Sequence, residues 1–274
     1  MPVEPPYPDV EELMTLIGEA GRRLAEIEAS EGAAGNISVC FGWEVDHRRE
    51  FPLESPLDLP VPVPELAGMR FLVTGSGRRL REIAADPAAN LGLVIVGEGG
   101  VTAKLHSSPR RLFERLTSEF NSHLAVHRDQ VAANRYNFHA LIHAQPMYLT
   151  YLSHIGRYQD QSYLNRHILR WQPESIVNLP EGVGYVPFRL PGSPELMAAT
   201  LEKMREHRVV LWAKHGVMAK SDTSVKRCVD RIEYAETGAK YEYLDLTNHG
   251  LADGLSADEI RAIADSLGIK QTVF

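Results

Sequence analysis

The sequence predicts a single α/β domain over residues 1–274, in which helices flank a mixed β-sheet. Two observations lead to this fold class. Short runs of β-branched and aromatic residues alternate with longer segments whose apolar residues recur every three to four positions. A hydrophobic content of 44% over 274 residues can also bury one large core, or two small ones, without disulfides or a structural metal. One domain is the simpler interpretation, because we find no internal repeat or low-complexity segment.

Six segments have the composition of β-strands. The run at residues 91–96 is continuously apolar, has the length of a strand and is followed by three glycines, which favours a hairpin or tight turn. Residues 52–64 are rich in proline and are therefore predicted to form a long loop. The predicted strands cover residues 37–43, 71–73, 91–96, 138–142, 183–188 and 209–212.

Helices are predicted from apolar residues at helical spacing and from capping residues. Asp9 is placed to cap an amphipathic helix that reaches residue 27. Ser193 followed by proline begins a helix that ends near residue 207. Ser256 and Glu259 have the spacing of a capping box and begin the last helix. Further helices are predicted over residues 117–129, 147–153 and 223–246.

The charge balance argues against a polyanionic partner. A formal net charge of −7 and a pI near 5.9 give no general attraction to nucleic acid or to an acidic membrane. The one local basic cluster consists of Arg78, Arg79 and Arg81. Such a short run is more simply a solvated surface or a subunit contact, so we expect no nucleic-acid or membrane partner.

The cysteines and the N-terminus predict a cytoplasmic protein. Cys40 and Cys228 are far apart and form no Cys-x-x-Cys pair, which favours a reducing compartment. The first nine residues are proline-rich and acidic, unlike a secretory signal. No apolar run approaches the roughly 20 residues that span a bilayer.

Two histidines stand where a predicted strand ends. His143 follows the strand at 138–142, and His215 follows the strand at 209–212 after two residues. In α/β folds chemistry is often found at strand ends, and neutral imidazole is a common ligand for zinc. The two histidines could therefore converge on one metal. Each could equally be a hydrogen-bonded structural residue.

Several short polar segments could bind an anion. Glu119 lies in Thr117-Ser118-Glu119, at the predicted start of a helix, and Asn36 lies in a glycine turn. Together with Gly75-Ser76-Gly77, these segments offer backbone N–H groups to a phosphate. Capping by Ser118 and an ordinary tight turn would explain each segment singly. In combination with two histidines and a carboxylate, they are typical of a metal-dependent phosphosugar enzyme.

The motifs occur in an order that is specific to one enzyme family. They are residues 35–38 (GNIS), 74–77 (TGSG), 86–92 (DPAANLG), 117–119 (TSE), 142–143 (IH), 180–184 (PEGVG) and 212–217 (WAKHGV). In this order and combination the chain resembles the class II aldolase and adducin family, and within it the aldolases that cleave L-rhamnulose 1-phosphate. The resemblance runs from about residue 32 to residue 246, most of the chain.

The resemblance implies a fold, an assembly and a reaction. The fold would be a single domain with a central, mainly antiparallel sheet, assembled as a homotetramer with active sites at subunit interfaces. The reaction would be cleavage of L-rhamnulose 1-phosphate, or a similar ketose 1-phosphate, to dihydroxyacetone phosphate and lactaldehyde. In such enzymes a zinc ion acts as the Lewis acid.

The resemblance also implies roles for individual residues. Glu119 would be the catalytic base and a metal ligand at rest. Glu174 would be a second acidic residue that reaches the site of the neighbouring subunit. The phosphate or enediolate would be surrounded by Asn36, Gly75, Ser76, Gly77 and Ser118.

The sequence departs from the family at Gln145. The first two zinc ligands of the family form His-x-His, and the matching positions here are His143 and Gln145. An amide oxygen is a poor substitute for imidazole on zinc. We therefore expect weaker zinc binding, or another divalent ion, at a site made of His143, His215, Gln145 and Glu119.

Other histidines are not expected to replace the missing ligand. His139 lies on the same strand face as His143 but about 13 Å away. His123 and His127 share a helix face and are interpreted as structural or surface residues.

Two other functions remain open at this point. A sugar-phosphate epimerase or dehydratase uses the same metal site. A non-catalytic, adducin-type association domain with a decayed metal site is favoured by Gln145. It is opposed by the retention of Glu119, His143 and His215.

Overall fold

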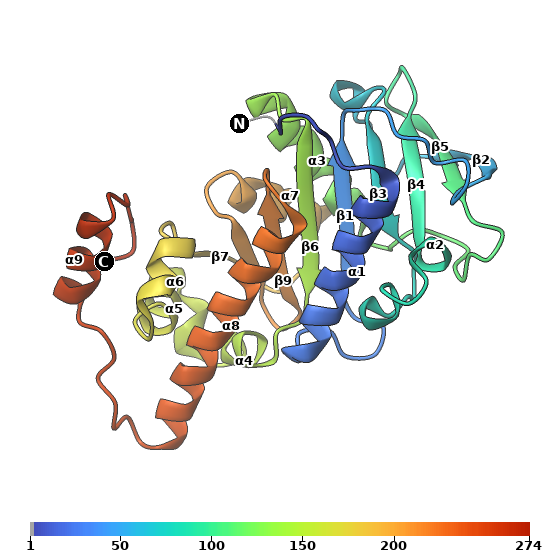
Figure 1. Cartoon of the computed structure of the whole chain (residues 1–274). Coiled ribbons are helices and arrows are strands. Elements are labelled where there is room, and N and C mark those ends of the chain that lie inside the picture. Colours follow the sequence, from blue (N-terminus) through green and yellow to red (C-terminus); the bar gives the residue numbers. More distant parts are fainter. Residues whose placement is uncertain (1–2) are drawn as a thin grey trace.

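A nine-stranded sheet forms the centre of the computed structural model, which describes residues 3–274 (Figure 1). The strand order is β2-β5-β4-β3-β1-β6-β9-β8-β7. Seven of the eight neighbouring pairs are antiparallel and only β7–β8 is parallel, which confirms the predicted α/β fold with a mainly antiparallel sheet. The strands are β1 Asn36–Phe41, β2 Leu53–Asp58, β3 Arg70–Thr74, β4 Leu91–Val96, β5 Thr102–Ser107, β6 Phe138–Ala144, β7 Val183–Val186, β8 Val209–Trp212 and β9 Gly216–Ser221.

Helices cover both faces of this sheet. Helices α1 and α8 contact each other on one face, whereas α3 and α7 pack together on the other (Figure 1). The helices are α1 Val10–Glu26, α2 Pro87–Asn90, α3 Phe120–Asn134, α4 Met147–Leu152, α5 Gln161–Ile168, α6 Pro173–Asn178, α7 Pro194–Met204, α8 Val225–Thr247 and α9 Ala257–Ser266. Short 3-10 turns are η1 Pro64–Leu66, η2 Leu80–Glu82 and η3 Gly156–Gln159.

Side-chain alternation along the central strand β6 divides the interior into two regions. Ala140 and Ile142 belong to the apolar core beneath α1 and α8. The intervening residues His139, Leu141 and His143 therefore point to the opposite face, where α3 lies. Polar side chains of β6 and α3 can thus meet on the α3 side, while the other side of the sheet stays apolar.

Helix ends follow the capping residues in the sequence. Asp9 and Ser256 each form a capping box, and the Ser193 side chain accepts a hydrogen bond from the N–H of Leu196. These contacts confirm the predicted starts of α1, α7 and α9. The apolar residues of the long helix at 225–247 are buried as its periodicity predicts.

Three strands of the sheet were not among those predicted, namely β2, β5 and β9. Residues 52–64 are not a continuous loop, because β2 occupies Leu53–Asp58 and pairs with β5. Proline is tolerated there because β2 is an edge strand and needs hydrogen bonds on one side only. Strand β9 follows the turn at His215 and was absent from the prediction.

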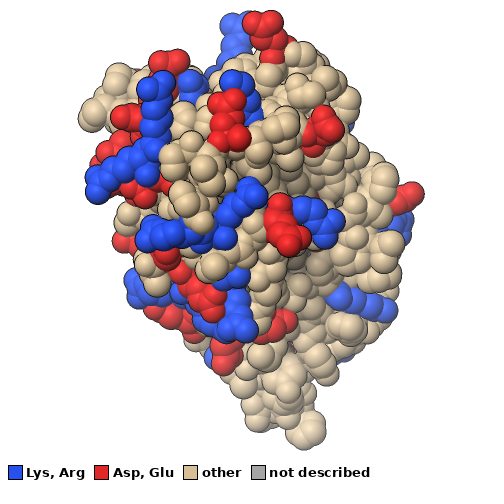
Figure 2. All heavy atoms as spheres, turned by 90° about the vertical axis from the view of Figure 1, so that its right-hand side faces the viewer, with Lys and Arg blue, Asp and Glu red and all other residues tan. Residues whose placement is uncertain are grey.

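The surface agrees with the interpretation of the charge pattern. Figure 2 shows acidic and basic side chains intermingled on the face that includes β2 and β5, with no broad area of one sign there. Arg79 is exposed and pairs with Glu82, as expected of a solvated surface cluster, whereas Arg78, which also pairs with Glu82, is half-buried and donates to Asn90. Cys40 and Cys228 are buried and unpaired. Within residues 3–274, none of the helices has the length and apolar character needed to cross a membrane.

Candidate metal centre and anion site

Residues from four distant segments meet at one end of the sheet. Asn36 begins β1 and lies opposite His143, near the end of β6, in the antiparallel register. His215 lies in the short turn between β8 and β9, and Glu119 directly precedes α3. One ligand atom from each of Glu119, His143 and His215 lies within 4.8 Å of the others. His143 belongs to the strand itself and not to a turn, because β6 extends to Ala144.

The separations of these donors fit a metal ion. His143 Nε2 lies 3.6 Å from Glu119 Oε2, and His215 Nε2 lies 3.6 Å from Glu119 Oε1. Bonds of about 2.0–2.2 Å in a tetrahedral site place donor atoms roughly 3.3–3.6 Å apart. These two distances end on different carboxylate oxygens, and one ligand atom from each group lies within 4.8 Å of the others, so the donors must close in slightly to share one divalent cation.

Hydrogen bonds and burial prepare both imidazoles to donate a lone pair. The Nδ1–H of His143 donates to the carbonyl of Val217 over 2.8 Å, which directs the lone pair of Nε2 toward Glu119. Burial lowers the pKa of His215 to about 4, with a further contribution from His143 and against the opposing effect of Glu119. His215 is therefore neutral at pH 7, as a metal ligand must be.

The carboxylate is held in its charged form. Burial alone would raise the pKa of Glu119, but His143 and a hydrogen bond from Asn36 lower it by more. This hydrogen bond joins Asn36 Nδ2 to Glu119 Oε2 over 2.8 Å. Glu119 Oε1 and His215 Nδ1 are buried without a partner in the described part of the chain. A buried carboxylate oxygen without a partner is costly, and a bound cation would satisfy it.

A cavity of about 190 Å³ adjoins these donors and holds most of the predicted anion-binding residues. The predicted ligand Gln145 is half-buried and lines this cavity together with Thr117. Its described walls contain no lysine or arginine. Charge compensation for a phosphate would therefore come from a metal and from the start of α3. The predicted residues in its walls are Asn36, Gly75, Ser76, Gly77, Ser118, Glu119, His143 and His215.

Two backbone N–H groups of the glycine turn are already hydrogen-bonded, whereas the sequence suggested that they would be free to bind a phosphate. Those of Gly75 and Ser76 already donate to the carbonyls of Asn90 and Arg115. They are therefore unavailable to a phosphate, so its donors must be side-chain hydroxyls and other N–H groups. Gly75 is still required by packing, since a Cβ there would lie 2.2 Å from Cγ of Phe113.

The start of α3 also differs from the expectation. Ser118 does not cap the helix; its side chain is exposed beside the cavity. The residue at the cap position is Glu119, and its side chain makes no capping hydrogen bond. The carboxylate of Glu119 contacts Asn36 and faces the histidines, so it does not accept a hydrogen bond from the first turn of α3.

Three further expectations concern residues outside this cluster. Glu174 is exposed in the first turn of α6 and does not line the cavity, so its role in a neighbouring subunit stays a prediction. His123 and His127 are fully buried, so they are structural and not surface residues. His139 does not belong to the donor cluster, as expected.

A second, larger cavity of about 730 Å³ shares His215 and Gln145 with the first. Its other walls come from the end of α1, the following loop and α4, and they include Arg81 and Tyr151. This cavity was not predicted, because most of its walls come from segments outside the motifs. Its position allows a substrate to extend from the metal donors into a more open space.

Comparisons with known proteins identify the family of this chain. The family described as Class II Aldolase and Adducin N-terminal domain matches residues 15–243. The rhamnulose-1-phosphate aldolase of Escherichia coli O81 (strain ED1a) is 31% identical over 225 residues, which are 82% of this chain and 80% of that protein. The rhamnulose-1-phosphate aldolase of Yersinia pestis (strain Pestoides F) is 31% identical over 241 residues, 85% of each chain. A solved sugar-phosphate aldolase from Thermotoga maritima has a TM-score of 0.74 at 28% identity, covering 87% of this chain and 96% of that one.

Proposed function

Because the chain belongs to the class II aldolase and adducin family, we propose that it is a cytoplasmic, divalent-metal-dependent aldolase that cleaves a ketose 1-phosphate. We propose L-rhamnulose 1-phosphate as the substrate, since the named relatives at 31% identity are rhamnulose-1-phosphate aldolases. The observation that carries the proposal is the convergence of Glu119, His143 and His215. A non-catalytic domain would have no physical reason to hold a buried carboxylate, one of whose oxygens has no hydrogen-bond partner in the described part of the chain, between two imidazoles.

In this proposal the metal is Zn²⁺ or another divalent ion, held by His143, His215 and Glu119. Gln145 lines the same cavity and would add a neutral oxygen donor. When bound, the ion supplies Lewis-acid chemistry by drawing electron density from the keto oxygen of the substrate. The hydroxyls of the cavity would bind the phosphate, which places the sugar chain toward the larger cavity.

Glu119 is the residue that we assign to proton transfer. Cleavage breaks the bond between the carbon next to the keto group and the carbon of the departing aldehyde. The hydroxyl on the departing carbon loses its proton as it becomes the aldehyde carbonyl, and the first carbon gains a proton. The carboxylate of Glu119 can take up a proton and pass it to this carbon, and it can remove that proton again in the condensation direction. Asn36 fixes Oε2 of this carboxylate through its amide N–H and keeps a second N–H for a substrate oxygen.

We further propose that the protein is a homotetramer whose sites lie at subunit interfaces. Met147 and Tyr151 are exposed apolar residues on α4 that line the larger cavity, and such residues favour contact with another copy. Glu174 would reach a neighbour's site from its exposed position. Light scattering would give the mass, and a fully active monomer would contradict this assembly.

The decisive experiment is a coupled assay for dihydroxyacetone phosphate with a panel of ketose 1-phosphates and metal-loaded protein. We expect the highest kcat/KM with L-rhamnulose 1-phosphate. Glu119→Gln should lower kcat by about 10²-fold or more, as loss of a general base does, while the protein keeps its fold. Metal-loaded protein that releases no dihydroxyacetone phosphate from any of these substrates would refute the proposal. Unaltered turnover in Glu119→Gln would remove Glu119 from its role.

A further inference from the structure

A chain of buried hydrogen bonds leads away from the proposed base into the space between β1 and α3. It begins with the amide of Asn36, whose Nδ2 donates to Glu119 Oε2 over 2.8 Å. The amide oxygen of Asn36 lies 2.5 Å from His123 Nε2. On its other side, His123 Nδ1 lies 2.6 Å from the hydroxyl of Ser38. Two side chains of β1 thus alternate with one imidazole of α3.

The chain continues through two more imidazoles. The hydroxyl of Ser38 also lies 2.7 Å from His127 Nε2, and His127 Nδ1 lies 2.8 Å from His139 Nδ1 on β6. We call Asn36, His123, Ser38, His127 and His139 the histidine chain. None of its members is more than 7% exposed. Bulk water therefore cannot readily replace any of these links.

The three imidazoles of the histidine chain are neutral. Burial lowers the pKa of His123 to about 4 and that of His139 to about 3, and it lowers the pKa of His127 well below its usual range. A neutral imidazole has one N–H and one acceptor nitrogen, so each ring must use one of its two nitrogens as donor and the other as acceptor.

The carboxylate of Glu119 determines which group donates in each of the three hydrogen bonds nearest to it. An ionised carboxylate only accepts, so the N–H of Asn36 must point to Glu119 and its oxygen to His123. His123 then carries its proton on Nε2, and its Nδ1 must accept from the hydroxyl of Ser38.

The same reasoning fixes the outer links. The Ser38 oxygen must accept from Nε2–H of His127, whose Nδ1 must accept from Nδ1–H of His139. All donors thus point toward Glu119, and reversal of any one link would bring two acceptors or two donors face to face.

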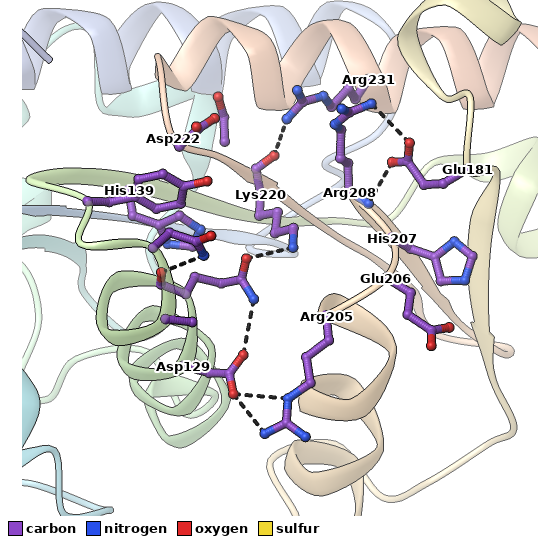
Figure 3. A pocket seen from close by; sticks show the side chains of 15 residues that line it. Asp129, His139, Glu181, Arg205, Glu206, His207, Arg208, Lys220, Asp222 and Arg231 are labelled. Atoms are coloured by element: carbon purple, nitrogen blue, oxygen red, sulfur yellow. Dashed lines mark hydrogen bonds and ion pairs between the residues drawn. The ribbon is translucent and has the colours of Figure 1, made fainter. Parts of the chain in front are cut away.

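The environment of His139, at the outer end of the histidine chain, is consistent with this assignment of donors and acceptors. The assignment leaves His139 Nε2 as an acceptor, and this atom has no partner in the described part of the chain. His139 stacks on Tyr136 and lies in the wall of a cavity of about 640 Å³, beside Lys220 (Figure 3). The histidine chain therefore crosses from the proposed active site to a third, polar cavity.

We propose that His123, Ser38, His127 and His139 are positioning residues that hold the Asn36 amide with its N–H toward Glu119. An amide that rotated by half a turn would place its oxygen against the carboxylate. Among the described residues, the bond from His123 is the one that opposes this rotation on the far side. The amide also interrupts proton hopping, so the histidine chain orients Glu119 and does not conduct protons. The kinetic consequence rests on the proposed function, whereas the orientation of the histidine chain does not.

The orientation is tested without any activity measurement. Long-range ¹H–¹⁵N correlation spectra of the full-length, histidine-labelled protein at neutral pH report which ring nitrogen carries the proton, before and after addition of Zn²⁺. We expect His123 and His127 to be protonated on Nε2 and His139 on Nδ1. The opposite tautomer at His123, or a doubly protonated ring at any of the three, would overturn the proposal.

The positioning role is tested by a pair of variants at one residue. His123→Leu removes the donor to Asn36, and we expect kcat to fall by about 10- to 100-fold while KM changes little. His123→Gln places an amide nitrogen where Nε2 lies and should restore most of this loss. His207→Gln is the matched control, because His207 is a buried histidine outside the histidine chain.

The outcomes separate this proposal from the proposed function. Equal losses in His123→Leu and His123→Gln, or no loss in either, would overturn the positioning role. A wild-type protein without aldolase activity would refute the proposed function alone, because the tautomers would still confirm or refute the orientation of the histidine chain. If His123→Leu fails to fold, the tautomers seen in the spectra of the wild type still decide the question.

Discussion

Replacing His215 by alanine should abolish the stabilisation of this protein by a divalent metal. The imidazole is one of three donors whose ligand atoms lie within 4.8 Å of one another, and it is the donor nearest to Glu119 Oε1 among the pairs described. In His215→Ala only the donors of Glu119 and His143 remain from this cluster. Metal content and metal-dependent stability should both fall, because binding to the native state is what stabilises it.

The expected magnitude follows from binding linkage. At a free metal concentration 100 times Kd, wild-type protein gains about 2.7 kcal/mol, which corresponds to a rise in Tm of roughly 5–11 °C for a chain of this size. Loss of a direct ligand should weaken binding by at least the roughly 100-fold seen for outer-shell partners. At the same metal concentration the variant would then gain only about 0.4 kcal/mol, or roughly 1–2 °C.

Thermal unfolding with and without Zn²⁺ or Mn²⁺ measures this difference, and elemental analysis gives the bound metal. The quantity to compare is the metal-dependent shift, since His215 also packs against Trp212 and its removal lowers the Tm of the metal-free protein. His167→Ala is a suitable control, because that imidazole is half-buried and stacks on Tyr163 outside the cluster. A variant that retains one equivalent of metal and the full shift would refute the assignment of His215 as a ligand.

Three further predictions concern metal affinity, pH and packing. Gln145→His should tighten Zn²⁺ binding by about tenfold or more in a chelator competition, because an imidazole replaces an amide oxygen; unchanged affinity would place this side chain outside the metal site. Burial raises the pKa of Glu236 from 4.5 to about 7, although it accepts two backbone N–H bonds from the start of α4. Its contribution to stability is therefore full below pH 4.5 and is lost as the pH rises through about 7, a change of about 3 kcal/mol. Denaturant unfolding of Glu236→Gln should show a flatter pH dependence than wild type, and identical slopes would contradict the assignment. Gly75→Ala should lower the free energy of unfolding by about 1–3 kcal/mol, because its Cβ would collide with Phe113. Gly156→Ala, which meets open space, should change it by less than about 0.5 kcal/mol, and equal effects of the two substitutions would show that the collision is relieved.

Local patterns in the sequence predicted most elements of the fold. The strand at Leu91–Val96 was predicted with its observed bounds, and Asp9 and Ser256 begin their helices through capping boxes. These features depend on apolar spacing and on hydrogen bonds within one turn, which neighbouring residues decide. Strand β2 was missed because Pro56 argues against a strand, and only its place at the edge of the sheet makes that proline acceptable.

The sequence indicated the site residues by their chemical type and their position in predicted elements. Which of them contact one another depends on the tertiary structure. Strand ends, a helix start and glycine turns indicated Glu119, His143 and His215 as possible partners, and their convergence in space could not be derived from spacing. The donors of the glycine turn show the limit of such reasoning. Gly75 and Ser76 suggested free N–H groups, yet both groups are bonded to distant segments of the chain.

The sequence by itself determined the kinds of elements, their approximate ends and the chemical types available to a metal and a phosphate. Only the tertiary structure decided which of these groups face one another. The register of β1 against β6 places Asn36 opposite His143, and the packing of α3 on the sheet brings His123 and His127 to Ser38. The physical reason is that register and helix packing are settled by the sum of many contacts between remote segments, which no local propensity contains.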